Sequence, residues 1–342
     1  MRLPLTTAAV LFLLAHSLAG QSTPYQAASN SEEVCKAALT WPLPPEPSGP
    51  LSAAQLKNCD EEELYYGFSG KPNYAAALQC GWYQRTHPEP YNSSMFRGPG
   101  VLAMLYANGY GVARDYKLAM RFVCENEWSA EAELDYRLGH LAYLRDGGAE
   151  NEPFDLCTDA TSGLTGGWCA DISARTEGVK RERRLHAAVA KLPPAAREKL
   201  PALQKAEAEF EKTRVETEID LSGTLRGAFQ IEDEQKLREQ FVINLTRFAA
   251  VDIPKSGAAE LAKLDGQLNE AYQRIQHSPA KTWEYGTIKP EGIQRTQRTW
   301  IKLAAAWEDF GRVAYPSLSS KAIRAQLIRL RLHQLRSLLP QD

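Results

Sequence analysis

Three helix-period segments near the end of the chain decide the fold: Leu264–Gln276 (LDGQLNEAYQRIQ), Ile293–Gly311 (IQRTQRTWIKLAAAWEDFG) and Ile323–Leu339 (IRAQLIRLRLHQLRSLL). In each segment apolar residues recur every three or four positions, which is the spacing of an amphipathic α-helix. The breaks between the segments contain His-Ser-Pro, Lys-Pro-Glu-Gly and Tyr-Pro-Ser, and proline and glycine interrupt helices. The sequence therefore predicts an all-α fold, with a helical domain in residues 256–342.

The preceding segment, residues 179–255, carries a comparable pattern and is predicted to form a helical hairpin. At a fixed offset of 90 positions, Leu203–Phe248 aligns with Ile293–Leu338, and five of the 46 aligned residues are identical. Two interpretations stay open: an internal duplication, or two amphipathic hairpins of equal length. Within this segment, Pro201 favours a helix that begins at the proline, because a proline in a helix interior removes a hydrogen bond.

Residues 52–146 follow a different helical plan, which is clearest in Gly100–Asn126 (GVLAMLYANGYGVARDYKLAMRFVCEN). The first apolar stretch ends at Gly109, and Gly111 completes a turn. Asp115 then stands where an N-cap residue would begin a second helix. An earlier copy of this hairpin and the first helix of a later one occupy Glu63–Leu78 and Ala130–Leu144. The pattern predicts a short array of α-hairpins.

Leu105–Val112 (LYANGYGV) and Asp115–Ala119 (DYKLA) resemble the Sel-one-like repeat, a relative of the tetratricopeptide repeat. The family pattern is Leu-Tyr-x-x-Gly-x-Gly-Val followed by Asp-Tyr-x-x-Ala, so Gly109, Gly111 and Asp115 are motif positions. The resemblance implies helix pairs that bury their apolar faces against neighbouring pairs. Such a module is suited to binding another protein.

Residues 256–342 resemble the LprI-type lysozyme-inhibitor domain, a small helical module of exported bacterial proteins. The resemblance rests on LNEAY, IQRTQRTW and RLHQL, and its motif positions are Leu268, Asn269, Tyr272, Gln297, Trp300, Arg331 and Leu335. It implies a helical fold in which these positions are structural, and it suggests inhibition of a lysozyme. The cysteine pair of the family has no counterpart here, because no cysteine follows Cys169.

The start of the chain has the features of a targeting signal. Arg2 precedes the mostly apolar stretch Leu3–Leu18, and Ser17 and Ala19 are small residues that suit cleavage. The sequence predicts a signal peptide in residues 1–19 and a periplasmic or secreted chain without stable membrane insertion. A transmembrane anchor is the alternative, and the short apolar run disfavours it. Residues 20–51 follow as a polar, proline-rich segment.

All six cysteines lie in the first half of the chain: Cys35, Cys59, Cys80, Cys124, Cys157 and Cys169. An even number of cysteines in an exported chain favours disulfides, and the spacing does not fit the rival zinc site. Pairing in chain order is the preferred arrangement. Cys157–Cys169 is the most credible pair, because it closes a short glycine-rich loop. It would hold together a loop-rich junction in residues 147–178.

The two halves of the chain differ in charge, with −9 from Gln21 to Ala170 and +6 from Asp171 to the end. This difference indicates two modules and argues against a nucleic-acid-binding protein. Acidic runs at Asp60–Glu63 and Glu125–Asp135 fit either a solvated face or a docking surface for a basic partner, such as a lysozyme.

No combination of residues indicates catalysis or a cofactor. The histidines stand alone, no serine lies in a Gly-x-Ser-x-Gly elbow, and the Gly-x-Gly at Gly109 follows a helix. Asp155 and Asp159 flank Cys157 and fit loop capping better than a glycosidase pair. We therefore expect no catalytic residue, no metal and no cofactor.

The leading hypothesis is a non-catalytic protein-binding protein of the bacterial cell envelope, and by resemblance a lysozyme inhibitor. A periplasmic scaffold for another exported protein is the second hypothesis. A cell-wall hydrolase is the third.

Overall fold

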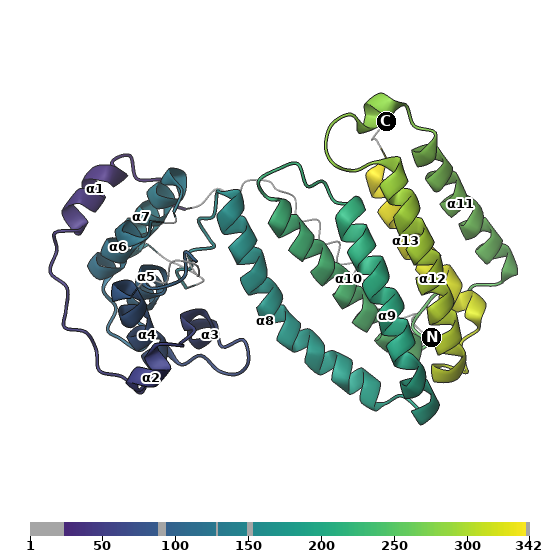
Figure 1. Ribbon diagram of the computed structural model, residues 1–342, viewed down its shortest axis with the longest axis horizontal. Helices are drawn as coiled ribbons and strands as arrows, with labels where there is room; N and C mark the ends of the chain where they lie inside the picture. Colours follow the sequence, from purple (N-terminus) through teal and green to yellow (C-terminus); the bar gives the residue numbers. More distant parts are fainter. Residues whose placement is uncertain (1–23, 88–93, 128, 149–152, 340–342) are drawn as a thin grey trace, which may run out of the picture.

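The computed structural model describes residues 24–87, 94–127, 129–148 and 153–339, and this part of the chain contains helices and no strand. The predicted signal peptide, residues 1–19, lies outside the described residues. Helices α1 to α7 form an N-terminal module and α9 to α13 a C-terminal one, with the long helix α8 between them (Figure 1). Each module has its own hydrophobic core, so the predicted all-α fold is confirmed.

The N-terminal module consists of short helices that pack as hairpins. They are α1 (Ser31–Ala38), α2 (Ala53–Leu56), α3 (Glu61–Tyr66), α4 (Tyr74–Thr86), α5 (Pro99–Asn108), α6 (Tyr116–Glu125) and α7 (Glu131–Arg145). Gly67 and Gly109 end α3 and α5 in the left-handed conformation, which glycine adopts without a steric penalty. Asn73 and Asp115 cap the helices that follow, as each side chain accepts backbone N–H groups. The helix ends predicted around Gly109 and Asp115 are confirmed.

The disulfides do not follow chain order. Cys35 pairs with Cys124 and Cys59 with Cys80, so the two predicted pairs Cys35–Cys59 and Cys80–Cys124 are wrong. The reason is tertiary: α1 packs against α6 and α7, whereas α2 and α3, on either side of Cys59, pack against α4. The predicted pair Cys157–Cys169 is confirmed, and all six cysteines are in disulfides.

Glu61 at the start of α3 is a fully buried carboxyl group, and its Oε1 accepts the Gly98 N–H at 2.9 Å. Burial raises the pKa of Glu61 to about 7. The folded state therefore keeps a proton that the unfolded chain loses near its ordinary pKa of 4.5. The contribution of Glu61 to the free energy of unfolding is therefore fully present below pH 4.5 and is lost as the pH rises toward 7.

We expect Glu61→Gln to stabilise the protein at pH 8 by about 1–3 kcal/mol, because the amide keeps an acceptor oxygen for Gly98 and carries no charge. At pH 4.5 the variant and the original chain should have nearly equal free energies of unfolding. Urea titrations at the two pH values measure this difference, with the exposed Glu32→Gln as control. Equal stabilisation at both pH values would contradict the assignment of a buried, ionising carboxyl.

Helix α8 (Gly163–Ala190) corrects the predicted junction, because it runs without a break through the boundary at residue 178. The loop ends at Ser162, whose side chain caps α8 by accepting the Thr165 N–H. The glycine-rich composition of this stretch indicated a loop, but at Gly163 glycine is required by close packing inside the fold. A Cβ atom there would lie 2.3 Å from the backbone of Thr224, closer than any real contact. Since the first part of α8 joins the N-terminal core and the last part the C-terminal core, the helix belongs to both modules.

The C-terminal module contains five long helices. They are α9 (Pro194–Thr217), α10 (Arg226–Ala249), α11 (Ala258–Gln276), α12 (Pro290–Ala314) and α13 (Ser320–Leu338), with a 3₁₀ turn at Ala280–Trp283. Helix α9 begins at Pro194 and passes through Pro201, so the helix start predicted at Pro201 is wrong. Pro201 is exposed, and the neighbouring Leu200 and Leu203 are buried in the core, which offsets the one hydrogen bond lost at the proline.

Two three-helix units make up this half of the molecule: the first unit is α8–α9–α10 and the second unit is α11–α12–α13. Helix α8 packs along α10, and α11 packs in the same way along α13. Helices α9 and α12 pack against each other and join the units. The Thr217 hydroxyl lies 2.6 Å from that of Thr296, and the Trp307 indole bonds to Glu207, so α9 and α12 run antiparallel. Exchanging the units maps the α8–α10 packing onto the α11–α13 packing and the α9–α12 packing onto itself, which is the arrangement that an internal duplication predicts.

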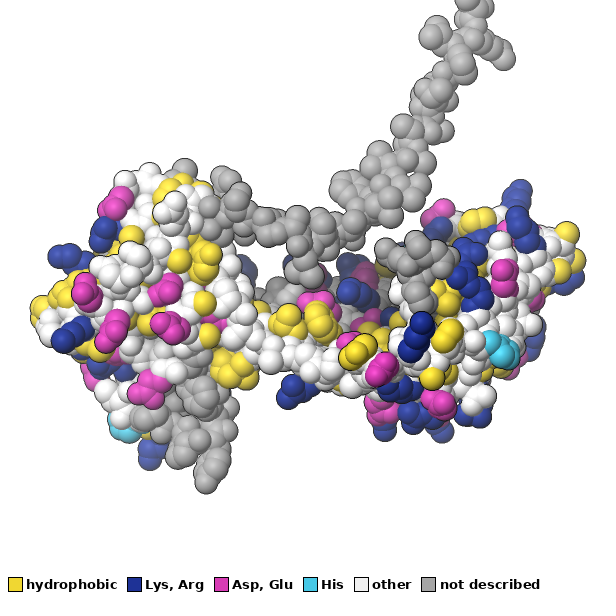
Figure 2. Space-filling model, turned by 90° about the horizontal axis from the view of Figure 1, so that it is seen from above, with side chains coloured by type: hydrophobic (Ala, Val, Ile, Leu, Met, Phe, Trp, Pro, Cys, Tyr) yellow, Lys and Arg dark blue, Asp and Glu magenta, His cyan; other side chains and the backbone are white. Residues whose placement is uncertain are grey.

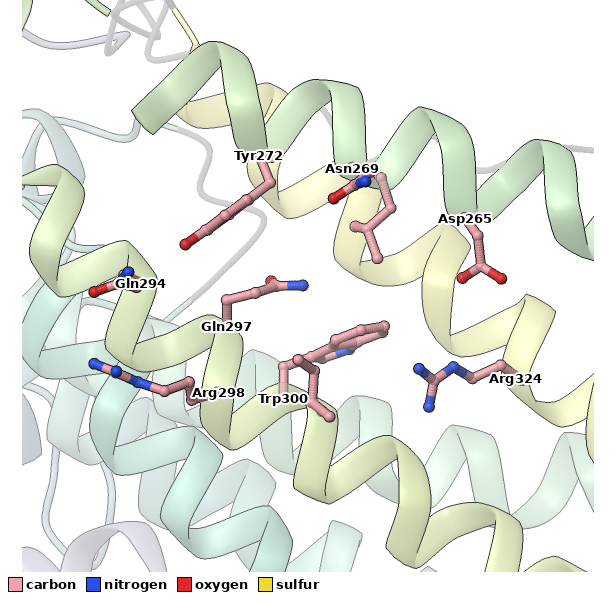
Figure 3. A pocket seen from close by; sticks show the side chains of 10 residues that line it. Asp265, Asn269, Tyr272, Gln294, Gln297, Arg298, Trp300 and Arg324 are labelled. Carbon is pink, nitrogen blue, oxygen red and sulfur yellow. The ribbon is translucent and has the colours of Figure 1, made fainter. Parts of the chain in front are cut away.

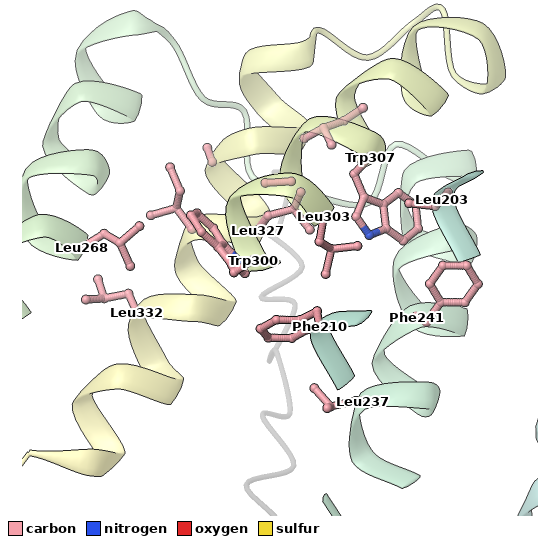
Figure 4. Close-up of a cluster of buried hydrophobic side chains, with 14 of the residues drawn as sticks. Leu203, Phe210, Leu237, Phe241, Leu268, Trp300, Leu303, Trp307, Leu327 and Leu332 are labelled. Atoms are coloured by element: carbon pink, nitrogen blue, oxygen red, sulfur yellow. The ribbon is translucent and has the colours of Figure 1, made fainter. Parts of the chain in front are cut away.

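The core between the units uses the residues that the offset of 90 aligns (Figure 4). The aligned and equally buried pairs are Leu203 with Ile293, Phe210 with Trp300, Leu237 with Leu327 and Leu245 with Leu335. Trp307 is fully buried among Phe241, Phe248 and Phe310, with ring centroids 5.3 to 6.0 Å apart. This aromatic packing joins α10 of the first unit to α12 of the second.

Candidate binding groove

A groove of about 460 Å³ opens between α11 and α12 of the second unit, with α13 at one end (Figure 3). We call it the second-unit groove. Its lining residues are Asp265, Leu268, Asn269, Tyr272, Gln294, Gln297, Arg298, Trp300, Ile301 and Arg324. Five of these are motif positions that the sequence singles out: Leu268, Asn269, Tyr272, Gln297 and Trp300. Residues from separate helices thus meet at one surface feature.

Helical spacing explains how the lining residues reach the groove. Residues four apart lie on the same face of a helix, as do Leu268 and Tyr272 on α11. On α12, Gln294, Gln297 and Ile301 recur at intervals of three and four, and all three line the groove. Trp300 is 4% exposed and forms the floor. The groove is therefore built on rigid elements rather than on loops.

The walls of the groove offer hydrogen-bonding groups that the protein itself does not use. Within the described residues, the side chains of Asn269, Tyr272 and Gln294 have no hydrogen-bond partner, and all three line the groove. Ile301 is 48% exposed at the rim. Amide and hydroxyl groups beside an indole and an exposed aliphatic side chain suit an extended polypeptide, whose backbone needs both donors and acceptors.

The second-unit groove has few charged lining residues, and they lie at its two ends. Asp265 and Arg324 lie at one end of the groove, and Arg298 lies at the other, near Gln294 (Figure 3). Arg324 is partly neutralised by Glu308 at 3.1 Å, and its guanidinium lies 5.3 Å from the Trp300 ring centroid. Direct hydrogen bonds and packing, more than net charge, should therefore govern what binds here.

Arg331 stands behind the groove and orients one of its walls. Its Nε donates to Gln297 Oε1 at 3.0 Å, and this leaves the Gln297 NH₂ group for the groove. The same guanidinium makes two bonds to Glu218, of 2.8 and 2.6 Å. Arg331 and Glu218 are both fully buried, so the pair fixes Gln297 from the interior.

The remaining predicted positions lie elsewhere. Leu335 is buried in the C-terminal core, while Gly109, Gly111 and Asp115 form the turn between α5 and α6 in the other module. Sequence reasoning missed Asp265, Gln294, Arg298 and Ile301, although they share helix faces with motif residues. No sequence signal identified Arg324, because only the packing of α13 brings it to the groove.

The two acidic runs of the N-terminal module are used inside the fold. Asp60, Glu62 and Glu63 surround Arg175 of α8 at 3.2 to 3.8 Å. Glu125 pairs with two arginines, and Glu133 is buried against Arg137. On the face seen in Figure 2, acidic and basic side chains are interspersed over this module. These paired residues stabilise the fold, which weakens the interpretation of the runs as an acidic docking surface.

Asp155 and Asp159 bind neighbouring groups of their own module. Asp155 accepts the Cys157 N–H and the Tyr66 hydroxyl, both at 2.8 Å. Asp159 accepts the Tyr25 hydroxyl at 2.6 Å and lies 3.0 Å from Nδ1 of His140. Within the described residues, no group of three His, Cys, Asp or Glu side chains is arranged to hold a metal ion.

Comparison with known proteins adds no relative: no family model, no curated protein and no solved structure matches the chain. None of the helices in the described ranges has the length and apolar character needed to span a bilayer.

Proposed function

We propose that the protein is an exported, non-catalytic protein-binding protein of the bacterial cell envelope, and that the second-unit groove holds a segment of its partner. The observation that carries this proposal is the meeting of five motif positions in one groove, where the side chains of Asn269, Tyr272 and Gln294 make no hydrogen bond within the described residues. The three disulfides support an oxidising compartment, where such bonds persist. The likeness of this unit to the lysozyme-inhibitor domain makes a lysozyme the first partner to test.

The groove suggests how the partner would bind. Asn269, Gln294 and the NH₂ group of Gln297 would pair with the backbone of an extended segment, and Ile301 would pack on one of its side chains. Because few of these contacts are charged, affinity should depend weakly on salt. An acidic face attracting a basic lysozyme would instead lose affinity steeply as salt rises.

The test is a binding assay of the oxidised mature chain against a panel of lysozymes and against periplasmic extract. We expect the double variant Arg298→Glu/Ile301→Ser to bind at least about tenfold more weakly than the original chain, because both residues line the groove. Both side chains are exposed, so the fold should not change. Arg295→Glu is the matched control, since Arg295 is an exposed arginine of α12 outside the groove.

Each outcome has a distinct meaning. Groove-dependent binding of a lysozyme supports the inhibitor form of the proposal. Groove-dependent capture of another exported protein supports the scaffold form. Binding that both variants leave unchanged, or turnover of peptidoglycan by the purified chain, would overturn the assignment of this groove.

A further inference from the structure

The first unit has a cavity in the same place as the second-unit groove. This first-unit cavity measures about 140 Å³ and lies among α8, α9 and α10. Its lining residues are Arg181, Glu182, Leu185, Gln204, Glu207, Ala208, Glu211, Arg238, Phe241 and Val242. At the offset of 90, five lining positions of the two sites coincide: Glu182 with Tyr272, Gln204 with Gln294, Glu207 with Gln297, Ala208 with Arg298, and Glu211 with Ile301. The two units therefore place a concave site at equivalent positions.

The chemistry of the two sites differs. Of the five coincident positions, only Gln204 and Gln294 are identical. The smaller volume of the first-unit cavity suits a single chemical group rather than a chain segment.

Arg181 is the feature of this cavity that indicates a ligand. Arg181 is only 7% exposed, and it lines the cavity. Within the described residues, Arg181 has neither a hydrogen bond nor an ion pair. Its pKa is lowered by burial and by the nearby Arg238. The carboxylates of Glu239 and Glu182 act on Arg181 only through space. An anionic group in the cavity would give this mostly buried guanidinium a direct hydrogen-bonded partner.

The other charged groups leave room for an anion. Glu211 of α9 and Arg238 of α10 neutralise each other at 2.6 Å. Glu182 of α8 is exposed at the edge. Glu239 of α10 also acts on Arg181 and is paired with Arg184. Glu207 of α9 bonds to the indole of Trp307 on α12. Burial and the nearby Glu211 raise the pKa of Glu207 to about 8, so at neutral pH it presents an O–H donor.

We propose that the first-unit cavity binds a carboxylate group, held by the side chains of Arg181, Gln204 and Glu207. A carboxylate has four acceptor positions and matches the forked donors of a guanidinium. The acidic side chain or the chain terminus of a polypeptide would carry it. This site stands apart from the proposed function, because none of its residues lines the second-unit groove.

Two isomeric probes test the proposal and separate the two sources of a carboxylate. The α-amide of N-acetylglutamic acid offers a side-chain carboxylate, and N-acetylglutamine offers a terminal one. Binding to the full mature chain is followed by the NMR signal of the Trp307 indole N–H, which the variant Trp307→Phe identifies. We expect saturable binding of one probe in the millimolar range, which is usual for ligands of this size. The probe that binds more tightly shows whether the site prefers a side-chain carboxylate or a terminal one.

Matched variants locate the binding. Arg181→Met should weaken it at least about tenfold, because the charged donor is lost. Arg183→Met removes the same charge from an exposed position of α8 and should change affinity less than about twofold. Affinity in the original chain should also fall as the pH rises from 7 to 9, as Glu207 ionises and repels the anion. Glu207→Gln keeps a donor and should abolish that pH dependence.

Any of three results would overturn the proposal: neither probe binds the original chain, Arg181→Met binds as tightly as Arg183→Met, or affinity rises with pH. The pH titration needs no variant, so it decides the matter even if Arg181→Met fails to fold. Since the second-unit groove is tested by Arg298→Glu/Ile301→Ser, failure at one site does not imply failure at the other.

Discussion

Replacement of Arg331 by methionine should lower the free energy of unfolding by about 3–5 kcal/mol, the usual cost of removing one partner of a buried ion pair. Arg331 of α13 and Glu218 at the end of α9 are both fully buried, and their two hydrogen bonds connect the two three-helix units. Methionine would fill much of the space but would leave the Glu218 carboxylate buried, with Arg214 at 3.8 Å as its nearest cation. Urea unfolding followed by tryptophan fluorescence measures the loss.

Two controls separate the ion pair from ordinary packing. Arg336→Met removes the same side chain from an exposed position of the same helix and should change stability by less than about 1 kcal/mol. The double variant Arg331→Met/Glu218→Gln should recover part of the loss, because no buried charge then remains unpaired. A loss for Arg331→Met no larger than that for Arg336→Met would contradict the role given to the pair.

The same pair connects the stability of the fold to the groove. Arg331 donates to Glu218 on one side and to Gln297 on the other, so one guanidinium holds the units together and orients a groove side chain. Sequence resemblance assigned Arg331 and Gln297 structural roles. The structure adds that Gln297 also lines the second-unit groove. Its place in a sequence motif does not by itself show that it borders a groove.

Local chemistry allowed the helix ends to be predicted. The left-handed Gly109 and the capping Asp115 lie where the sequence placed them, because both effects act within one turn of the chain. Helix α8 shows the limit of such reasoning. Its glycines indicated a loop, yet at Gly163 the requirement is the closeness of Thr224, more than sixty residues away in the chain. The prediction of a helix start at Pro201 was wrong for a similar reason. Packing of the neighbouring leucines in the core outweighed the local preference of proline for the first position of a helix.

The likeness of the two three-helix units illustrates which information the alignment of the sequence with itself lacked. Five identities in 46 positions do not distinguish descent from coincidence. The structure supplies the antiparallel packing of α9 on α12, the equivalent pairings of the flanking helices, and two concave sites with five coincident positions. Arg181 and Arg324 could not be assigned to these sites from sequence. The other lining residues of each site lie on different helices, and only the tertiary packing places them beside the arginine.

Loss of the Cys35–Cys124 disulfide should destabilise the N-terminal module by about 4 kcal/mol, more than loss of Cys157–Cys169, for which about 3 kcal/mol is expected. The first bond closes a loop with a sequence separation of 89, and the second closes one of 12. The Cys59–Cys80 bond, with a separation of 21, shortens the free part of the larger loop to 89 − 21 = 68 and changes the estimate little.

The weak anchoring of α1 is a second reason to expect a large effect from loss of the Cys35–Cys124 disulfide. Helix α1 has eight residues and buries only Ala38, and an isolated helix of this length is not stable in water. Besides the disulfide, Arg121 of α6 fixes its end by donating to the carbonyl of Leu39 at 2.8 Å. Without the covalent bond, α1 should open before the rest of the module does.

The measurement compares two double variants, Cys35→Ala/Cys124→Ala and Cys157→Ala/Cys169→Ala, by urea unfolding and by hydrogen exchange of α1. We expect the first variant to lose the protection of the α1 amides and to unfold at the lower urea concentration. If the second variant were the less stable one, the attachment of the start of α8 by Cys169 would matter more to the module than closure of the long loop. Unchanged protection of α1 in the first variant would show that Arg121 and the packing on α6 and α7 hold this helix without the disulfide.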